Sequence, residues 1–275
     1  AAVFNLVPYL GPVIGAVPAV LLGLTVSPLT ALLAIGLFSG LVHGFVGIGF
    51  PLVATPLFSL LFGFQQAIPL LVMPTLLMVL CTMTAFGRSL PPRDALRLYW
   101  PLLPTLPIGI YLGTRALFAL DTDVLSLLLA AVVAIFLYLD RHGRSQVPLM
   151  QRHPTLFSVP FGLAGRICEG AVNVSGPMLL IFFLMLDLEA GAIIAVMSYL
   201  FLLGKVVQAT ELARIGALDA AVWQAAFPLC ATGAAMFFLG LRLRRRFDPA
   251  RYRGWLKGTL ALMVMLLVLR VLTPG

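Results

Sequence analysis

The sequence predicts an all-α integral membrane protein. The expected architecture is a helical bundle of two inverted repeats, each a broken, re-entrant helix pair plus three transmembrane helices, with one extra N-terminal helix. Hydrophobic residues make up 61% of the chain and charged residues 10%, with a mean hydropathy of +1.07, whereas about a quarter of a soluble domain is charged. Apolar stretches reach the roughly 20 residues that a helix needs to cross a bilayer, and strand-like alternation is absent.

Nine apolar segments follow one another along the chain, and two of them are interrupted. The continuous segments are expected to cross the membrane as helices, because they are apolar over about the length of a membrane span. The interrupted ones contain glycine and proline at the break and are expected to form half-helices. The segments are 6–25, 29–62 with a break near 47–51, 67–87, 98–118, 124–139, 156–186 with a break near 173–177, 190–210, 220–241 and 255–272.

The two interrupted segments contain an internal repeat. Residues 36–51 read GLFSGLVHGFVGIGFP and residues 162–177 read GLAGRICEGAVNVSGP. An offset of 126 residues places Gly36 on Gly162, Gly44 on Gly170 and Pro51 on Pro177. Broken helices at corresponding positions of two halves are typical of the solute sites of membrane transporters.

Three basic loops indicate the topology. Twelve of the eighteen basic residues fall in the loops 88–97, 141–152 and 242–253, which the positive-inside rule places in the cytoplasm. An even number of crossings must separate the last two of these loops, yet three apolar segments lie between them. We therefore expect the interrupted segment to be re-entrant, with half-helices of about a dozen residues that rise only about 18 Å.

This topology divides the chain into four parts. We expect an extra transmembrane segment at 1–28, the first repeat at 29–139, a cytoplasmic linker at 140–155 and the second repeat at 156–275. Three crossings per repeat turn the second repeat upside down relative to the first. In the first repeat the alternative is a full crossing, because its apolar segment is continuous into the break.

The residues at the two breaks are candidates for binding an anion. Pro51 and Pro177 are expected at the first position of the second half-helices, where proline loses no needed hydrogen bond. The backbone before them would present free N–H groups at the positive ends of two helices. The alternatives are that the breaks only kink the helices or allow close packing, or that the carbonyl ends bind a cation. The other residues assigned to the breaks are Gly47, Gly49, Phe50, Asn173, Ser175 and Gly176.

Charged side chains inside apolar segments are costly and are therefore functional candidates. Arg166 and Lys205 are candidate anion contacts, and Glu169 or its counterpart His43 is a candidate proton acceptor. In the alternative, Arg166 pairs with Glu169 three residues on, Lys205 binds carbonyls, and His43 is a satisfied buried histidine. Tyr199 is a candidate neutral contact on the helix after the second break.

Signatures of catalysis and ATP hydrolysis are absent from the sequence. It contains no Walker-type GxxxxGK[ST], no HExxH and no GxSxG. The three cysteines lack metal-ligand or redox spacing. We therefore expect neither an enzyme nor a cofactor, and the basic residues indicate topology, so no nucleic-acid partner is expected. The expected partners are a small anionic solute and membrane lipid, with self-association into a homo-oligomer left open.

The repeated breaks resemble those of the TauE/SafE sulfite exporter family. Phe50, Pro51 and Asn173 depart from the glycines frequent in that family. The resemblance implies a permease of the bacterial cytoplasmic (inner) membrane that moves sulfite, sulfonates or similar small anions, coupled to an ion gradient. An anion channel and a non-transporting assembly factor are the alternatives. The matching residues are Gly36, Gly40, Gly44, Gly47, Gly49 and Pro56 in the first copy and Ser175, Gly176 and Pro177 in the second.

Residues 1–28 differ from the rest of the chain. Residues 5–20 read NLVPYLGPVIGAVPAV, which is similar to a short segment of autoinducer exporter-type permeases. This similarity implies an additional membrane segment and no role in binding the solute.

Overall fold

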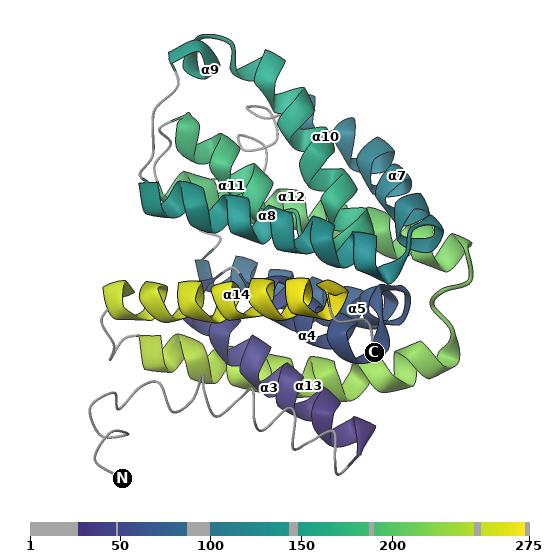
Figure 1. The fold of residues 1–275 in the computed structure, drawn as a ribbon. Coiled ribbons are helices and arrows are strands. Elements are labelled where there is room, and N and C mark those ends of the chain that lie inside the picture. Colours follow the sequence, from purple (N-terminus) through teal and green to yellow (C-terminus); the bar gives the residue numbers. More distant parts are fainter. Residues whose placement is uncertain are drawn as a thin grey trace.

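The computed structural model describes residues 27–47, 49–86, 100–142, 148–186, 190–244 and 249–272. Within these ranges every regular element is a helix (Figure 1), so the predicted all-α class is confirmed. The predicted segment 6–25 and the basic loop 88–97 lie outside the described residues.

The helices correspond closely to the predicted apolar segments. In the described part of the chain, five stretches are long and apolar enough to cross a membrane. The two segments predicted to be interrupted are divided into α3 and α4 and into α10 and α11. In order, the elements are α3 (Pro28–Val46), α4 (Phe50–Phe62), α5 (Phe64–Phe86), the 3₁₀ helix η1 (Trp100–Leu102), α7 (Thr105–Ala119), α8 (Thr122–His142), α9 (Pro148–Arg152), α10 (Pro154–Val172), α11 (Gly176–Met185), α12 (Ala190–Arg214), α13 (Ala220–Arg244) and α14 (Pro249–Leu272).

Both breaks occur where the repeat predicts them. The α3 helix ends before a left-handed Gly47, and α10 ends before Asn173, which has φ 60°. Pro51 and Pro177 are the second residues of α4 and α11, so their predicted place at the first position is wrong by one residue. Either position suits proline, because the first N–H groups of a helix have no partner within it.

The predicted length of the first half-helices is wrong. We expected about a dozen residues, but α3 and α10 have 19 residues each, or about 28 Å at 1.5 Å per residue. Each helix begins upstream of the glycine repeat, with a proline in its first turn. Their second halves are short as predicted, with 13 residues in α4 and 10 in α11.

The spacing of the sequence repeat is also found in the first residues of the helices. The helices α10, α11 and α12 begin 126 residues after α3, α4 and α5, respectively. This is the offset that aligns the two glycine-rich segments in the sequence. The repeated unit therefore includes at least three helices and not only the breaks.

The two first half-helices pack closely on helices of the opposite half. The α3 helix packs on α13 and α10 packs on α7. A methyl group at Gly40 would overlap the backbone of Gly233, and one at Gly113 would overlap the carbonyl of Ile167. Small residues of this kind let helix backbones approach one another in membranes.

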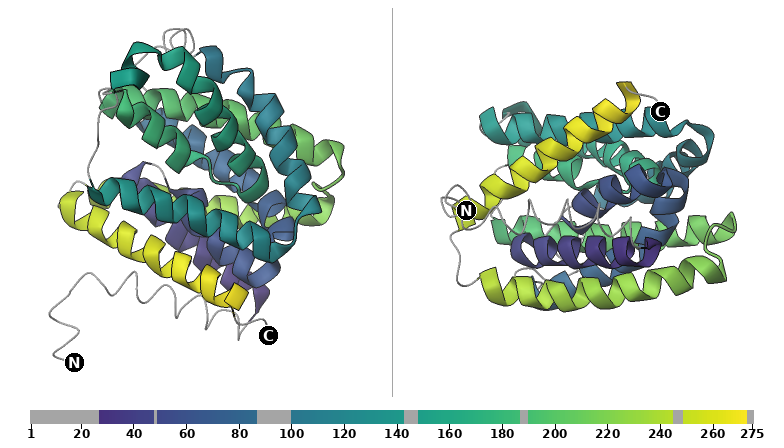
Figure 2. Two further views of the ribbon diagram at one scale, coloured as in Figure 1. Left: turned by 45° about the horizontal axis from the view of Figure 1, so that its top comes forward. Right: turned by 60° about the horizontal axis from the view of Figure 1, so that its bottom comes forward.

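Corresponding helices of the two halves make corresponding contacts. The pair α3 and α13 has its counterpart in α10 and α7. In addition to these two pairs, α5 packs on α12, and α8 lies beside α14 across the middle of the molecule (Figures 1 and 2). Two repeats related by a pseudo-two-fold axis would produce this pattern. The inverted orientation of the repeats relative to a bilayer stays a prediction, as do the three boundaries between the four parts.

The α4 helix lies in the interior of the bundle. Residues from Phe50 to Ser59 are buried except for Pro51, so this helix is apolar on every side. A helix that is hydrophobic all round belongs inside a large protein or a membrane. Its N-terminus therefore places the first break deep in the molecule, next to the second.

Candidate functional site

The two breaks meet at one cavity. It is lined by Gly47 and Gly49 from the first break and by Asn173, Ser175 and Gly176 from the second. The cavity volume is about 30 Å³, and since a buried water needs about 10–15 Å³, the cavity holds about two waters. It is therefore a small site between the two halves of the chain.

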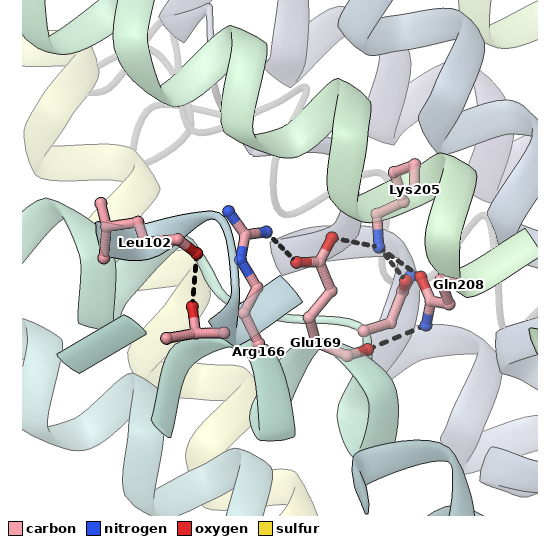
Figure 3. A network of polar contacts seen from close by, with 7 residues as sticks. Leu102, Arg166, Glu169, Lys205 and Gln208 are labelled. Carbon is pink, nitrogen blue, oxygen red and sulfur yellow. Dashed lines mark hydrogen bonds and ion pairs between the residues drawn. The ribbon is translucent and has the colours of Figure 1, made fainter. Parts of the chain in front are cut away.

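A buried ion-pair network forms one wall of this cavity (Figure 3). Glu169 on α10 pairs with Arg166 one turn earlier, and its Oε1 lies 3.2 Å from Lys205 Nζ on α12. The exposed fractions of the three side chains are 0%, 0% and 3%. Charges this deeply buried are tolerated only when they are paired and hydrogen-bonded.

Lys205 connects the network to the second break. Its ammonium donates hydrogen bonds of 2.7 Å to Asn173 Oδ1 and to Gln208 Oε1. Gln208 in turn donates from Nε2 to the carbonyl of Glu169 at 2.8 Å. The helix end at the break and the ion pair are therefore held by one hydrogen-bonded group of side chains.

Asn173 also joins the two halves of the chain. It donates from Nδ2 to Thr55 Oγ1 on α4 at 3.1 Å, while its Oδ1 accepts from Lys205. Its backbone is left-handed, and asparagine adopts this conformation more readily than other non-glycine residues. The asparagine that departs from the family pattern thus ends α10 and links α12 to α4.

The charges of the network do not balance. With all three groups ionised, Arg166 and Lys205 carry two positive charges against one negative charge on Glu169, which leaves a net charge of +1. In the described part of the chain, Nε and Nη2 of Arg166 also have no hydrogen-bond partner. An anion that enters the cavity would neutralise the excess charge.

At the first break, the side chain of a histidine caps the helix that follows. Phe50 donates its backbone N–H to His43 Nδ1 at 2.9 Å. Because Nδ1 accepts this bond, we assign the proton of the neutral ring to Nε2, which donates to Thr82 Oγ1 at 2.7 Å. The hydroxyl of Thr82 donates a hydrogen bond of 2.9 Å to the carbonyl of Met78. His43 therefore caps the N-terminus of α4 through Nδ1, while Nε2 bonds Thr82 on α5.

In the described part of the chain, the second break lacks a side-chain cap of the kind that His43 provides at the first break. The N–H of Gly176, the first residue of α11, has no hydrogen-bond partner among the described residues. Gly176 lines the cavity together with Lys205. Free N–H groups and the helix dipole make such an end an anion site. The two helix ends thus differ, and α11 presents the free amide.

Comparison with known proteins identifies the family. The profile for Sulfite exporter TauE/SafE matches residues 32–270. The chain belongs to the TauE/SafE family. No curated protein and no solved structure gives a match. Members of the TauE/SafE family are membrane permeases, which agrees with the multi-pass helical fold.

The structure places most of the predicted TauE/SafE site residues around the cavity. Phe50 and Pro177 lie in the first turns of α4 and α11, Arg166 lies behind Glu169, and Tyr199 is half-buried on α12; none of these four lines the cavity. The predicted residues that line it are His43, Gly47, Gly49, Pro51, Glu169, Asn173, Ser175, Gly176 and Lys205.

Sequence reasoning did not assign several residues of the cavity wall. Thr75, Thr82 and Ser198 lie on the helices that follow the breaks, and their polar side chains made them weak candidates. The apolar ones carry no signal that separates them from ordinary packing residues. These are Leu52, Val79, Val174 and Phe201.

Two other features contribute nothing to this site. A larger hollow of about 730 Å³ lies between α7 and the end of α12, beside Arg115 and Arg214, and contains none of the predicted site residues. Within the described ranges, no group of three His, Cys, Asp or Glu residues is placed to hold a metal ion.

Proposed function

We propose that this TauE/SafE protein is a secondary transporter of the bacterial cytoplasmic membrane. It moves a small organic or sulfur-containing anion, such as sulfite or a sulfonate, by alternating access, and a proton or another ion drives it. The observation that carries the proposal is the meeting of Lys205 and the free N–H of Gly176 at one buried cavity between the two halves of the chain.

The choice of an anion rests on charge. The buried network has a net charge of +1 when its three groups are ionised, and the positive end of α11 adds to it. A cation would meet the charge of Lys205. Oε1 of Glu169 makes no hydrogen bond with any described residue, but its charge is already paired with Lys205 at 3.2 Å. The carbonyl ends of α3 and α10 are partly satisfied, since the N–H of Gly47 donates to the carbonyl of His43 and the N–H of Asn173 donates to that of Glu169.

A transporter agrees better with the cavity than a channel does. Its volume of about 30 Å³ holds about two waters, and residues of both halves line it. In alternating access, one repeat moves against the other around a fixed central site. The hydrogen bond between Asn173 and Thr55 crosses between the halves and would break or shift in that motion.

Coupling to a proton is assigned to Glu169. While Glu169 is ionised, it attracts Lys205, which lies 3.2 Å away. Protonation removes that charge and frees the ammonium for the solute, so a proton and an anion would load together. His43 is the less suitable carrier, because a second ring proton would remove the acceptor for the N–H of Phe50.

Reconstitution tests this proposal directly. Purified protein in proteoliposomes is given labelled sulfite, methanesulfonate or sulfoacetate, with and without an imposed pH gradient. We expect saturable flux that the gradient drives uphill. Flux that never exceeds equilibrium would indicate a channel, and no flux of any of these anions would contradict the proposal.

A further inference from the structure

One buried hydroxyl of the cavity wall has no partner. Thr75 lies on α5 with 2% of its surface exposed, and it lines the cavity. Its Oγ1 makes no hydrogen bond with any described residue. Two other described hydroxyls share this lack of a partner, those of Ser39 and Thr114, but neither lines this cavity.

The missing bond is unusual for a helical threonine. Such hydroxyls commonly donate to the carbonyl three or four residues earlier, as Thr82 does to Met78 and Thr84 does to Cys81. Thr75 does not use this option. A buried hydroxyl without a partner destabilises a protein unless something else satisfies it.

Thr82 lies seven residues further along the same face of α5 and shows the contrast. It lines the same cavity, but its Oγ1 accepts a hydrogen bond from His43 Nε2 and its O–H donates one to the carbonyl of Met78. The hydroxyl of Thr82 is therefore committed to the fold. Among the two threonines of this wall, Thr75 has the hydroxyl that is available to a ligand.

We propose that Thr75 is a specificity-determining solute contact, whose hydroxyl donates a hydrogen bond to an oxygen of the transported anion. This inference rests on the proposed function. Thr75 on α5, Gly176 on α11 and Lys205 on α12 supply donors from three elements around one small space. The ligand that satisfies all three is a compact oxyanion with several acceptor oxygens.

The inference has a signature that a structural role would not produce. Thr75→Val keeps the shape of the side chain and removes the unsatisfied hydroxyl, so the ligand-free protein should be at least as thermally stable as wild type. The half-saturating concentration of inorganic sulfite should rise by roughly 10- to 100-fold, as expected for a lost hydrogen bond to a charged group. Stability and affinity thus move in opposite directions.

The test measures sulfite uptake into proteoliposomes and the melting temperature of the purified, full-length protein. Thr75→Ser keeps the hydroxyl and should stay within about threefold of wild type, well below the loss expected from removing a hydrogen bond to a charged group. Ser39→Ala is the matched control, because it also removes an unpartnered buried hydroxyl but not from the cavity wall; its uptake should be unchanged. If the valine variant does not fold, Thr75→Ala is used in its place.

The outcomes separate the two proposals. Flux in wild type with an unchanged half-saturating concentration in Thr75→Val would overturn the role of Thr75 and leave the transporter assignment intact. A serine variant as weak as the valine variant would also overturn it, because the hydroxyl would then not be the deciding group. Absence of anion flux in both wild type and Ser39→Ala would overturn both proposals.

Discussion

The ammonium of Lys205 donates a 2.7 Å hydrogen bond to Oδ1 of Asn173, the residue that ends α10 in a left-handed conformation. The same ammonium lies 3.2 Å from Glu169 Oε1. One cation is therefore shared between the helix break and the buried carboxylate. Any anion bound in the cavity would compete with these two groups for Lys205, which gives the site its expected chemistry.

Replacing Lys205 should abolish anion transport. Lys205→Met keeps an unbranched side chain one atom shorter but lowers the net charge of the network from +1 to zero. Arg166 still pairs with Glu169, so we expect a folded protein with at least a 100-fold lower rate of uptake, since a charged hydrogen bond contributes about 1.5–3 kcal/mol and the ion's own charge adds to this. Lys257→Met on α14 is the control, and it should transport like wild type. Equal uptake by both variants would remove Lys205 from the site.

Asn173 should couple the two halves of the chain energetically. Asn173→Gly tolerates the left-handed backbone but loses the bonds to Thr55 and Lys205. Thr55→Val removes one of the same bonds. A double-mutant cycle on the rate of uptake should give an interaction energy of about 0.5–3 kcal/mol, as is found for residues in contact. Strictly additive effects would show that the bond between the halves does not contribute to transport.

Glu169 and His43 should respond differently to neutral replacement. Glu169→Gln cannot exchange a proton, so it should move the anion downhill but fail to accumulate it under a pH gradient. His43→Gln can still accept from Phe50 and donate to Thr82, so it should keep gradient-driven uptake. The measurement is the accumulation ratio at several imposed gradients. The reverse pattern would assign the proton to His43.

Gly204 should be required for the ion pair. A Cβ at this position of α12 would lie 2.8 Å and 2.9 Å from the two carboxylate oxygens of Glu169, closer than real Cβ atoms approach other atoms. Gly204→Ala should therefore displace the pair, lowering both the melting temperature and uptake. Gly258→Ala on α14 meets nothing within 4 Å and should be neutral or slightly stabilising. Loss of uptake in both variants alike would refute this specific role.

The breaks could be predicted from the sequence because their signal is local. Glycine and proline in matched apolar segments are enough to interrupt a helix, and the helices that follow are continuous and apolar. The predicted segments 29–62 and 156–186 begin within two residues of α3 and α10, but the expected length of these half-helices was wrong, because it was measured from the repeated glycines and not from the start of the segment. Which helices would pack together could not be read from the sequence, since close packing depends on backbone contacts between distant segments.

The polar candidates could be named but not assigned their roles. The sequence identifies His43 and Thr75 as polar residues in apolar segments, without showing which of them already has its hydrogen bonds satisfied. That difference depends on partners elsewhere in the chain, such as Phe50 for His43. The sequence therefore predicts most of the residues that gather at the cavity, and the fold shows which of their polar groups already have hydrogen-bond partners.

A structure with bound selenite, the selenium analogue of sulfite, most directly tests the claim that the cavity between the two breaks binds the anion. Selenite is a compact oxyanion, and the anomalous scattering of selenium locates it without ambiguity. We predict one selenium peak in the cavity, within hydrogen-bond reach of Lys205 Nζ and the N–H of Gly176 through its oxygens. A protein that transports selenite but shows the peak elsewhere, with this cavity unchanged, would contradict the account.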